Sequence, residues 1–319
     1  MRWTWPLNAR ASNGQRKKRN GSDANRARPD FMCIGVHKGG TTWLYQQLDA
    51  HPDFWMPPLK ELHYLDQLSR VQRSSSPRCR DERDRCFLEG INRLSAKPCL
   101  DLEHYAQLFE PKGPLLSGDI SPNYSTLSSE VIRHVVRYFP ELKVIFLARD
   151  PVERVWSHLS MEVHYHQIEA FDVTDVDEVN RNLLRRGLLL RSYPSTIVAR
   201  WKRYVHPERF RIYFFDDLQR NPTELRRCIL DFLGADPDKT NKGVPAEYNS
   251  WARMGRLPLT DKVRSHLARF FKKELKTCAV RLGGAARDWP AKYGFLLILF
   301  VWDLLDDSID LLFWWDCIS

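Results

Sequence analysis

Apolar and polar positions follow two patterns along the chain, and together they predict an α/β fold. Short runs rich in apolar residues occur at 31–36, 143–148 and 210–215, with a weaker one at 115–120. Such runs are typical of strands buried on both faces of a parallel sheet. Because helical patterns alternate with them, we expect a single α/β domain with a central parallel sheet flanked by helices on both faces.

The helical patterns lie between the predicted strands. Their ranges are 43–48, 128–139, 151–166, 178–204, 222–233 and 260–281. Residues 70–99 show little periodicity, so we predict a long loop or an insertion there.

Both ends of the chain differ in charge from the middle. Residues 1–29 carry eight Lys or Arg and one acid, whereas residues 295–319 carry five Asp and no base. We expect a disordered basic tail at 1–29, the folded domain at 30–294 and an apolar, acidic, amphipathic helix at 295–319. Four aspartates in that helix make a membrane crossing too costly, so we expect it to contact a membrane surface or another subunit.

The cysteines, the N-terminal sequence and the histidines predict the compartment of the protein and the absence of a metal site. The chain has seven cysteines, an odd number, and no Cys-x-x-Cys pair. It also shows no apolar signal-peptide segment, so we predict reduced thiols in a cytoplasmic protein, peripheral to a membrane. A local bridge between Cys79 and Cys86 is the alternative. The histidines show no metal-ligand spacing, so no metal site is predicted.

A glycine turn after the first predicted strand is the first candidate binding site. It comprises Lys38, Gly39, Gly40, Thr41 and Thr42 and leads into a helix. A helix N-terminus binds phosphate or sulfate through its free N–H groups, and glycines let the backbone approach the anion. The nucleotide-binding Walker A motif places its lysine after the glycines. Lys38 precedes them, which argues against an NTPase.

A second anion site is predicted after the strand at 143–148. Arg149 begins the segment Arg-Asp-Pro-Val-Glu-Arg-Val-Trp-Ser, which ends at Ser157 on the following helix. A guanidinium and a hydroxyl that converge at a strand end can hold a phosphate.

Together these two segments resemble the PAPS-dependent sulfotransferase family, where PAPS is 3'-phosphoadenosine-5'-phosphosulfate. The resemblance runs from about residue 31 to 294 and is strongest to the carbohydrate branch of heparan-type and bacterial enzymes. It implies a P-loop-like fold, with the donor's 5'-phosphosulfate held by residues 38–42 and its 3'-phosphate by Arg149 and Ser157. His37 stands where many members have proline, which removes none of the anion donors.

The segment Lys-Glu-Leu-His-Tyr-Leu-Asp at residues 60–66 resembles a carbohydrate-branch motif, Lys-Glu-x-His-Phe-Phe-Asp. The resemblance implies that Glu61 is the catalytic base, assisted by Lys38, and that Lys60 and Asp66 contact the acceptor. His63 is the rival base, because the small-molecule branch uses a histidine.

Two weaker matches complete the candidate site. Residues 118–125 resemble Gly-Glu-Lys-Ser/Thr-Pro-x-Tyr, with Ile120 in place of the lysine. This match implies that Asp119 and Tyr124 border the acceptor, with a purely structural role as the equal alternative. A loose match at residues 241–253 implies that Lys242 and Arg253 contact the donor.

The predicted function is transfer of a sulfuryl group from PAPS to a hydroxyl or amine of a carbohydrate or glycolipid. The predicted product is adenosine 3',5'-bisphosphate, and the predicted partners are the nucleotide donor and a carbohydrate or lipid-linked acceptor, with no specific nucleic acid. The alternatives are a P-loop nucleotide kinase or NTPase and a non-catalytic, membrane-associated scaffold.

Overall fold

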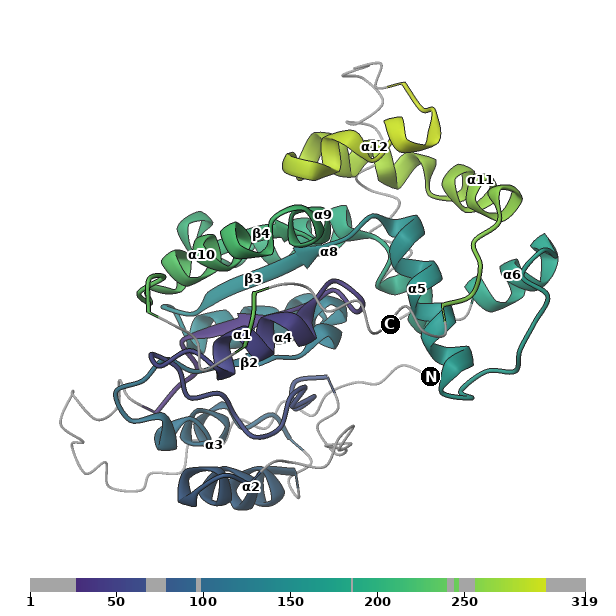
Figure 1. Cartoon of the computed structure of the whole chain (residues 1–319). Helices are drawn as coiled ribbons and strands as arrows, with labels where there is room; N and C mark the ends of the chain where they lie inside the picture. The colour runs from purple at the N-terminus through teal and green to yellow at the C-terminus, as the bar shows by residue number, and fades with distance from the viewer. Residues whose placement is uncertain are drawn as a thin grey trace.

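Four parallel strands form the centre of the molecule (Figure 1). This computed structural model describes residues 27–66, 79–95, 99–184, 186–239, 244–246 and 256–296. The strand order is β2 (Gly118–Ile120), β1 (Phe31–Cys33), β3 (Lys143–Ala148) and β4 (Phe210–Phe214). In the register, Phe31 lies opposite both Gly118 and Lys143. The predicted strands are confirmed, each within its predicted range.

Helices follow the strands, mostly where the sequence predicts them. They are α1 (Thr41–Asp49), α2 (Glu82–Ser95), α3 (Leu102–Gln107), α4 (Ser129–Tyr138), α5 (Pro151–His164), α6 (Val176–Leu183), α7 (Arg186–Leu190), α8 (Pro194–Lys202), α9 (Phe215–Arg220), α10 (Pro222–Leu233), α11 (Asp261–Phe270) and α12 (Lys272–Arg281). The prediction of one helix over 178–204 is wrong. Pro194 begins α8 and lacks the N–H that would continue a preceding turn.

Side chains of β1 and β3 alternate between two apolar cores, because successive strand residues point to opposite faces. Cys33 and Leu147 join the core that includes residues of α1, α9 and α10. Met32 and Phe146 join the larger core, with residues of α4, α5 and α8. The predicted α/β fold, with helices on both faces of a parallel sheet, is therefore confirmed.

A helix, α2, lies inside the segment predicted as a loop. Its residues Phe87, Ile91 and Leu94 are buried in the larger core and are spaced as one helix face. The charged residues between them concealed this pattern in the sequence. Figure 1 shows α2 and α3 at the opposite end of the molecule from α11 and α12.

Several predicted features lie outside the described residues. They include most of the basic tail, residues 297–319 of the C-terminal helix, Lys242 and Arg253. Their structures and the predicted contacts of residues 295–319 stay predictions. Of the helices that the structure describes, none combines the length and apolar character needed to cross a membrane. Cys79 and Cys86 are free thiols.

Candidate active site

A glycine turn joins β1 to α1 at the carboxyl edge of the sheet. Gly40 is the N-cap of α1 with a φ of 99°, and no side chain caps the helix. The first amides of α1 are therefore available to an anion. A Cβ at Gly39 would lie 2.6 Å from the carbonyl oxygen of Leu147, so the close approach of this turn to β3 requires glycine. This geometry suits the anion-binding turn that the sequence predicts.

Arg149 connects the second predicted anion site to this turn. It follows β3, and its Nη1 donates a hydrogen bond of 2.6 Å to the carbonyl oxygen of Lys38. Its guanidinium lies 4.0 Å from the centre of the Phe215 ring. Ser157 is half-buried in the second turn of α5. The fold thus brings two motifs together that are far apart in the sequence.

A cavity of about 370 Å³ adjoins Arg149. Phe215, Arg256 and Arg264 line it, and the carboxylate of Glu153 pairs with both of these arginines. Sequence reasoning missed Phe215, Arg256 and Arg264 as residues of the site. No motif marks them, and only the fold brings them beside Arg149.

Positive charge gathers around Lys38. Burial lowers the pKa of Lys38, and the charges of Arg149, Lys60, Arg154 and Arg256 lower it further. Several basic side chains gathered beside a turn with free amides favour the binding of a compound with several negative charges.

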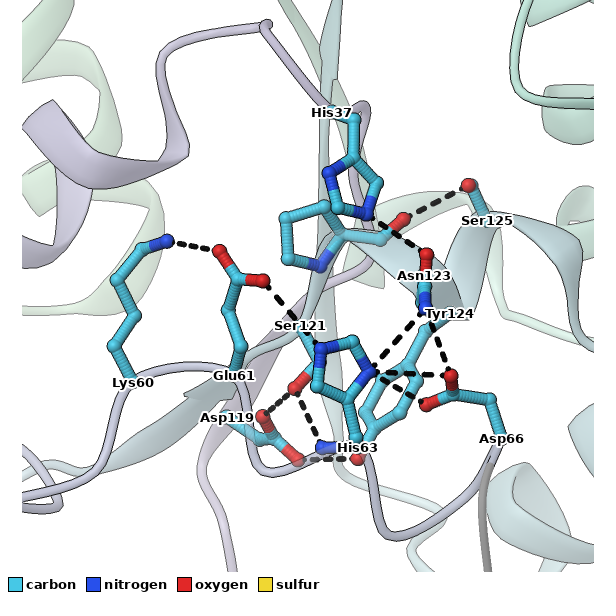
Figure 2. A network of polar contacts seen from close by, with 11 residues as sticks. His37, Lys60, Glu61, His63, Asp66, Asp119, Ser121, Asn123, Tyr124 and Ser125 are labelled. Carbon is cyan, nitrogen blue, oxygen red and sulfur yellow. Dashed lines mark hydrogen bonds and ion pairs between the residues drawn. The ribbon is translucent and has the colours of Figure 1, made fainter. Parts of the chain in front are cut away.

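The loop at residues 60–66 forms the second half of the site (Figure 2). Lys60 Nζ pairs with Oε1 of Glu61, and Nε2 of His63 lies 3.5 Å from Oε2 of Glu61. On its other side, Nδ1 of His63 lies 3.1 Å from Oδ2 of Asp66. The four residues that the sequence singled out in this loop therefore form one connected cluster.

These charges fix the protonation states within the loop. Burial raises the pKa of Glu61, but the hydrogen bond from His63 and the charge of Lys60 outweigh it and hold that pKa well below its usual range. Burial lowers the pKa of His63, yet Asp66 and Glu61 raise it to about 9. At neutral pH, Glu61 is therefore a carboxylate and His63 an imidazolium.

Asn123 links the loop to the glycine turn. Its Nδ2 donates to Asp66 at 3.0 Å, and its Oδ1 accepts a hydrogen bond of 2.8 Å from Nε2 of His37 (Figure 2). His37 directly precedes Lys38, so this bridge holds the Glu61 cluster beside the anion-binding turn. Sequence reasoning missed Asn123, although it lies in the segment 118–125 that was predicted to border the site.

Asp119 lies in the core behind the loop. It is 1% exposed and accepts hydrogen bonds from Ser121 Oγ at 2.6 Å, Tyr105 at 2.8 Å and Tyr124 at 2.7 Å. Ser121 Oγ in turn accepts a hydrogen bond from the backbone N–H of His63 at 3.4 Å. Tyr124 is also fully buried. The predicted contacts of Asp119 and Tyr124 with an acceptor do not fit this burial, and both residues support the loop from the core.

Backbone strain concentrates at the candidate site. Lys38, Glu61 and His63 have φ values of 68°, 64° and 53°. In the described part of the chain, His166 is the remaining non-glycine residue with a positive φ. Each such conformation costs roughly 1–2 kcal/mol and is often found at active sites. The strain therefore favours a functional role for the turn and the loop.

Known proteins share both sequence and fold with this chain. Residues 29–239 match the model of the Sulfotransferase family. A protein-tyrosine sulfotransferase from Drosophila melanogaster is 25% identical over 213 residues, which are 66% of this chain and 38% of that relative. The chain thus spans well under half the length of this curated relative.

Solved sulfotransferase structures resemble the fold. The sulfotransferase from Alicyclobacillus acidocaldarius aligns with a TM-score of 0.60 and 22% identity, over 82% of this chain and 99% of that one. The sulfotransferase domain from the curacin biosynthetic pathway aligns with a TM-score of 0.50 and 17% identity, over 85% and 99%. At these identities they show a shared P-loop-like fold. Because the family model spans about two thirds of the residues, the chain belongs to the sulfotransferase family.

Proposed function

We propose that this protein transfers a sulfuryl group from PAPS to a hydroxyl or amine of an acceptor. One observation carries the proposal: the ionised Glu61 lies beside a turn whose free amides and Lys38 suit an anionic donor. In the proposed step, an acceptor oxygen or nitrogen attacks sulfur, and the bond from sulfur to the bridging phosphate oxygen breaks. The acceptor proton passes to Glu61, and adenosine 3',5'-bisphosphate leaves with the electron pair.

The donor fits the two anion sites by charge. We assign its 5'-phosphosulfate to Lys38 and to residues 39–42, whose amides and hydroxyls offset charge on the leaving phosphate and the sulfuryl oxygens. We assign its 3'-phosphate to Arg149 and Ser157. Arg256 lines the adjoining cavity and supplies a further cation that the sequence did not single out.

Protonation favours Glu61 over His63 as the base. With a pKa of about 9, His63 already carries its proton at neutral pH and cannot take another. Glu61 is ionised at neutral pH and is therefore the one of the two that can accept a proton. His63 then orients Glu61 through the contact at Nε2, while Asp66 holds His63 from the other side.

The acceptor class rests on resemblance. The loop at residues 60–66 favours a carbohydrate or glycolipid hydroxyl. A tyrosine phenol is the second candidate, favoured by the likeness to a protein-tyrosine sulfotransferase. Turnover of PAPS with a matched panel of sugars and tyrosine peptides separates the two.

Calorimetric titration with adenosine 3',5'-bisphosphate tests the donor. We expect micromolar binding to the wild type, little binding of ATP, and at least a roughly 10-fold weaker affinity in Arg149→Ala, because a charged hydrogen bond is lost. Arg203→Ala is the control, since Arg203 is an exposed arginine after α8. ATP binding with Mg²⁺-dependent phosphotransfer would support a kinase instead. A folded protein that ignores the bisphosphate would leave the scaffold as the better explanation.

A further inference from the structure

His37 joins the glycine turn to the loop at residues 60–66 through Asn123, and the proposed step gives it no role. Its Nε2 lies 2.8 Å from Oδ1 of Asn123 (Figure 2). Nδ2 of Asn123 donates a hydrogen bond of 3.0 Å to Oδ2 of Asp66. Since the amide nitrogen faces this carboxylate, the amide oxygen faces His37 and can only accept a hydrogen bond from it. Burial lowers the pKa of His37 well below its usual value, so the neutral ring carries its one proton on Nε2.

A second histidine packs against the ring of His37. The ring centre of His158 is 5.6 Å from that of His37. Nδ1 of His158 accepts a hydrogen bond of 3.1 Å from Nη1 of Arg154, because a guanidinium can only donate. Nε2 of His158 lies 3.4 Å from Oε1 of Glu162. His158 is thus fixed by two neighbours on α5, and it limits the positions that are open to His37.

Arg154 is itself held in the core. It is fully buried, and its Nη2 donates to the carbonyl oxygen of Leu188 at 2.8 Å and to Ser192 Oγ at 2.7 Å. A continuous series of contacts therefore runs from a buried guanidinium through both histidines toward the loop at residues 60–66.

Asn123 acts on the proposed base through Asp66 and His63. Oδ2 of Asp66 accepts the hydrogen bond from Asn123 and lies 3.1 Å from Nδ1 of His63. Nε2 of His63 in turn lies 3.5 Å from Oε2 of Glu61. An amide that turned away from Asp66 would therefore release His63, and with it the contact to Glu61.

The loop depends on contacts from outside because its backbone is strained. Glu61 and His63 have φ values of 64° and 53°, in the left-handed region that side chains disfavour. Such conformations persist only where surrounding contacts hold them. The hydroxyls of Ser121 and Tyr124 hold two backbone N–H groups of the loop, at 3.4 Å each. The amide of Asn123 adds a hold on a side chain, so its loss would free the side chains while the backbone stays supported.

We propose that His37 is a positioning residue that, by donating from Nε2 to Asn123, keeps the cluster around Glu61 in its productive orientation. This inference rests on the proposed function and adds to it a residue that acts only through other side chains. Many members of the family that the sequence resembles have proline at this position, and proline has no side-chain donor. The role is therefore a property of this chain rather than of the family motif.

Two variants of His37 separate this role from a purely structural one. His37→Leu removes the donor and keeps an apolar side chain in its place, whereas His37→Gln keeps an N–H donor. For each variant we measure kcat with PAPS and an acceptor that the wild type accepts from the panel of sugars and tyrosine peptides. We also measure the affinity for adenosine 3',5'-bisphosphate by calorimetry, and urea unfolding. His134→Leu is the control for the loss of an imidazole, because His134 is exposed on α4.

We expect His37→Leu to lower kcat roughly 10- to 100-fold, because a small misplacement of a catalytic group costs about this much. Its affinity for the bisphosphate should equal that of the wild type, since the amides of the glycine turn are unchanged. His37→Gln should recover most of the lost kcat, and His134→Leu should lose none. The tautomer is measured on the wild type without any acceptor. In nitrogen NMR spectra of the labelled protein, the ring of His37 should carry a proton on Nε2 and none on Nδ1.

Three results would overturn the assignment of His37. One is a folded His37→Leu protein with the kcat of the wild type, and another is a ring of His37 whose proton lies on Nδ1. The third is a folded His37→Leu protein that no longer binds the bisphosphate, which would place His37 in donor binding instead. By contrast, a wild type that fails to bind the bisphosphate contradicts the proposed function itself and leaves the tautomer measurement unaffected, so the two failures are distinguishable.

Discussion

Replacing His63 by glutamine tests the charge arrangement on which the proposed base depends. In the wild type, the imidazolium of His63 lies between Glu61 and Asp66, 3.5 Å and 3.1 Å from their oxygens. Glutamine keeps a polar side chain of similar length but carries no charge. The change therefore isolates the attraction between His63 and its two carboxylates.

The expected loss of stability follows from the pKa of His63. Burial lowers it, but Asp66 and Glu61 raise it from 6.5 to about 9 in the folded protein. The folded state thus binds this proton more tightly than the unfolded state does. The resulting stabilisation is fully present below pH 6.5 and is lost as the pH rises through 9. A rise of this size corresponds to about 3 kcal/mol of unfolding free energy.

Urea unfolding of the wild type and His63→Gln at a series of pH values measures this effect. We expect the wild type to be more stable by about 3 kcal/mol at pH 6, and the two proteins to converge by about pH 10. His134→Gln is the control for the loss of an imidazole, because His134 is exposed on α4. A gap between wild type and His63→Gln that stays constant from pH 6 to 10 would refute the assignment of His63 as an imidazolium.

Three further changes probe the rest of the site. Glu61→Gln should lower kcat roughly 10²- to 10⁴-fold and leave the affinity for adenosine 3',5'-bisphosphate intact; near-normal turnover would remove Glu61 as the base. Asp119→Asn should cost about 1–3 kcal/mol in urea unfolding, because Asp119 accepts three buried hydrogen bonds, and an unchanged midpoint would contradict its support of the loop. Gly40→Ala should weaken binding of the bisphosphate at least roughly 10-fold, because the N-cap has a φ of 99°. Gly113→Ala is the control, because Gly113 also has a positive φ, of 58°, but lies away from the turn. Equal losses of affinity in the two variants would show that Gly40 has no specific role in anion binding.

Patterns within short segments of the sequence predicted much of the fold. The strand at 143–148 and the turn at 38–42 were found because each feature lies within a few consecutive residues. The helix α2 was missed although it is also local, because Phe87, Ile91 and Leu94 are separated by charged residues. The stretch at 178–204 is the opposite case, since its long periodic pattern contains separate helices, the last of which begins at Pro194.

The residues of the candidate site also differ in whether a local motif reveals them. The loop at residues 60–66 supplied Lys60, Glu61, His63 and Asp66 from one short motif, and the structure places them in one cluster. Arg256 carries no motif, and only the fold brings it to the cavity beside Arg149. Sequence could not identify such a residue, because its neighbours are distant along the chain.

By itself, the sequence determined the four strands, many of the helices, the two anion motifs and the motif that contains Glu61. These depend on side-chain periodicity and on chemistry held within single turns. Only the tertiary structure decided that Asp119 is buried behind the loop, and that Asn123 ties the loop to His37 beside Lys38. It also decided which of Glu61 and His63 carries a proton. Burial and protonation depend on groups brought together in space, and these come from segments that are far apart in the sequence.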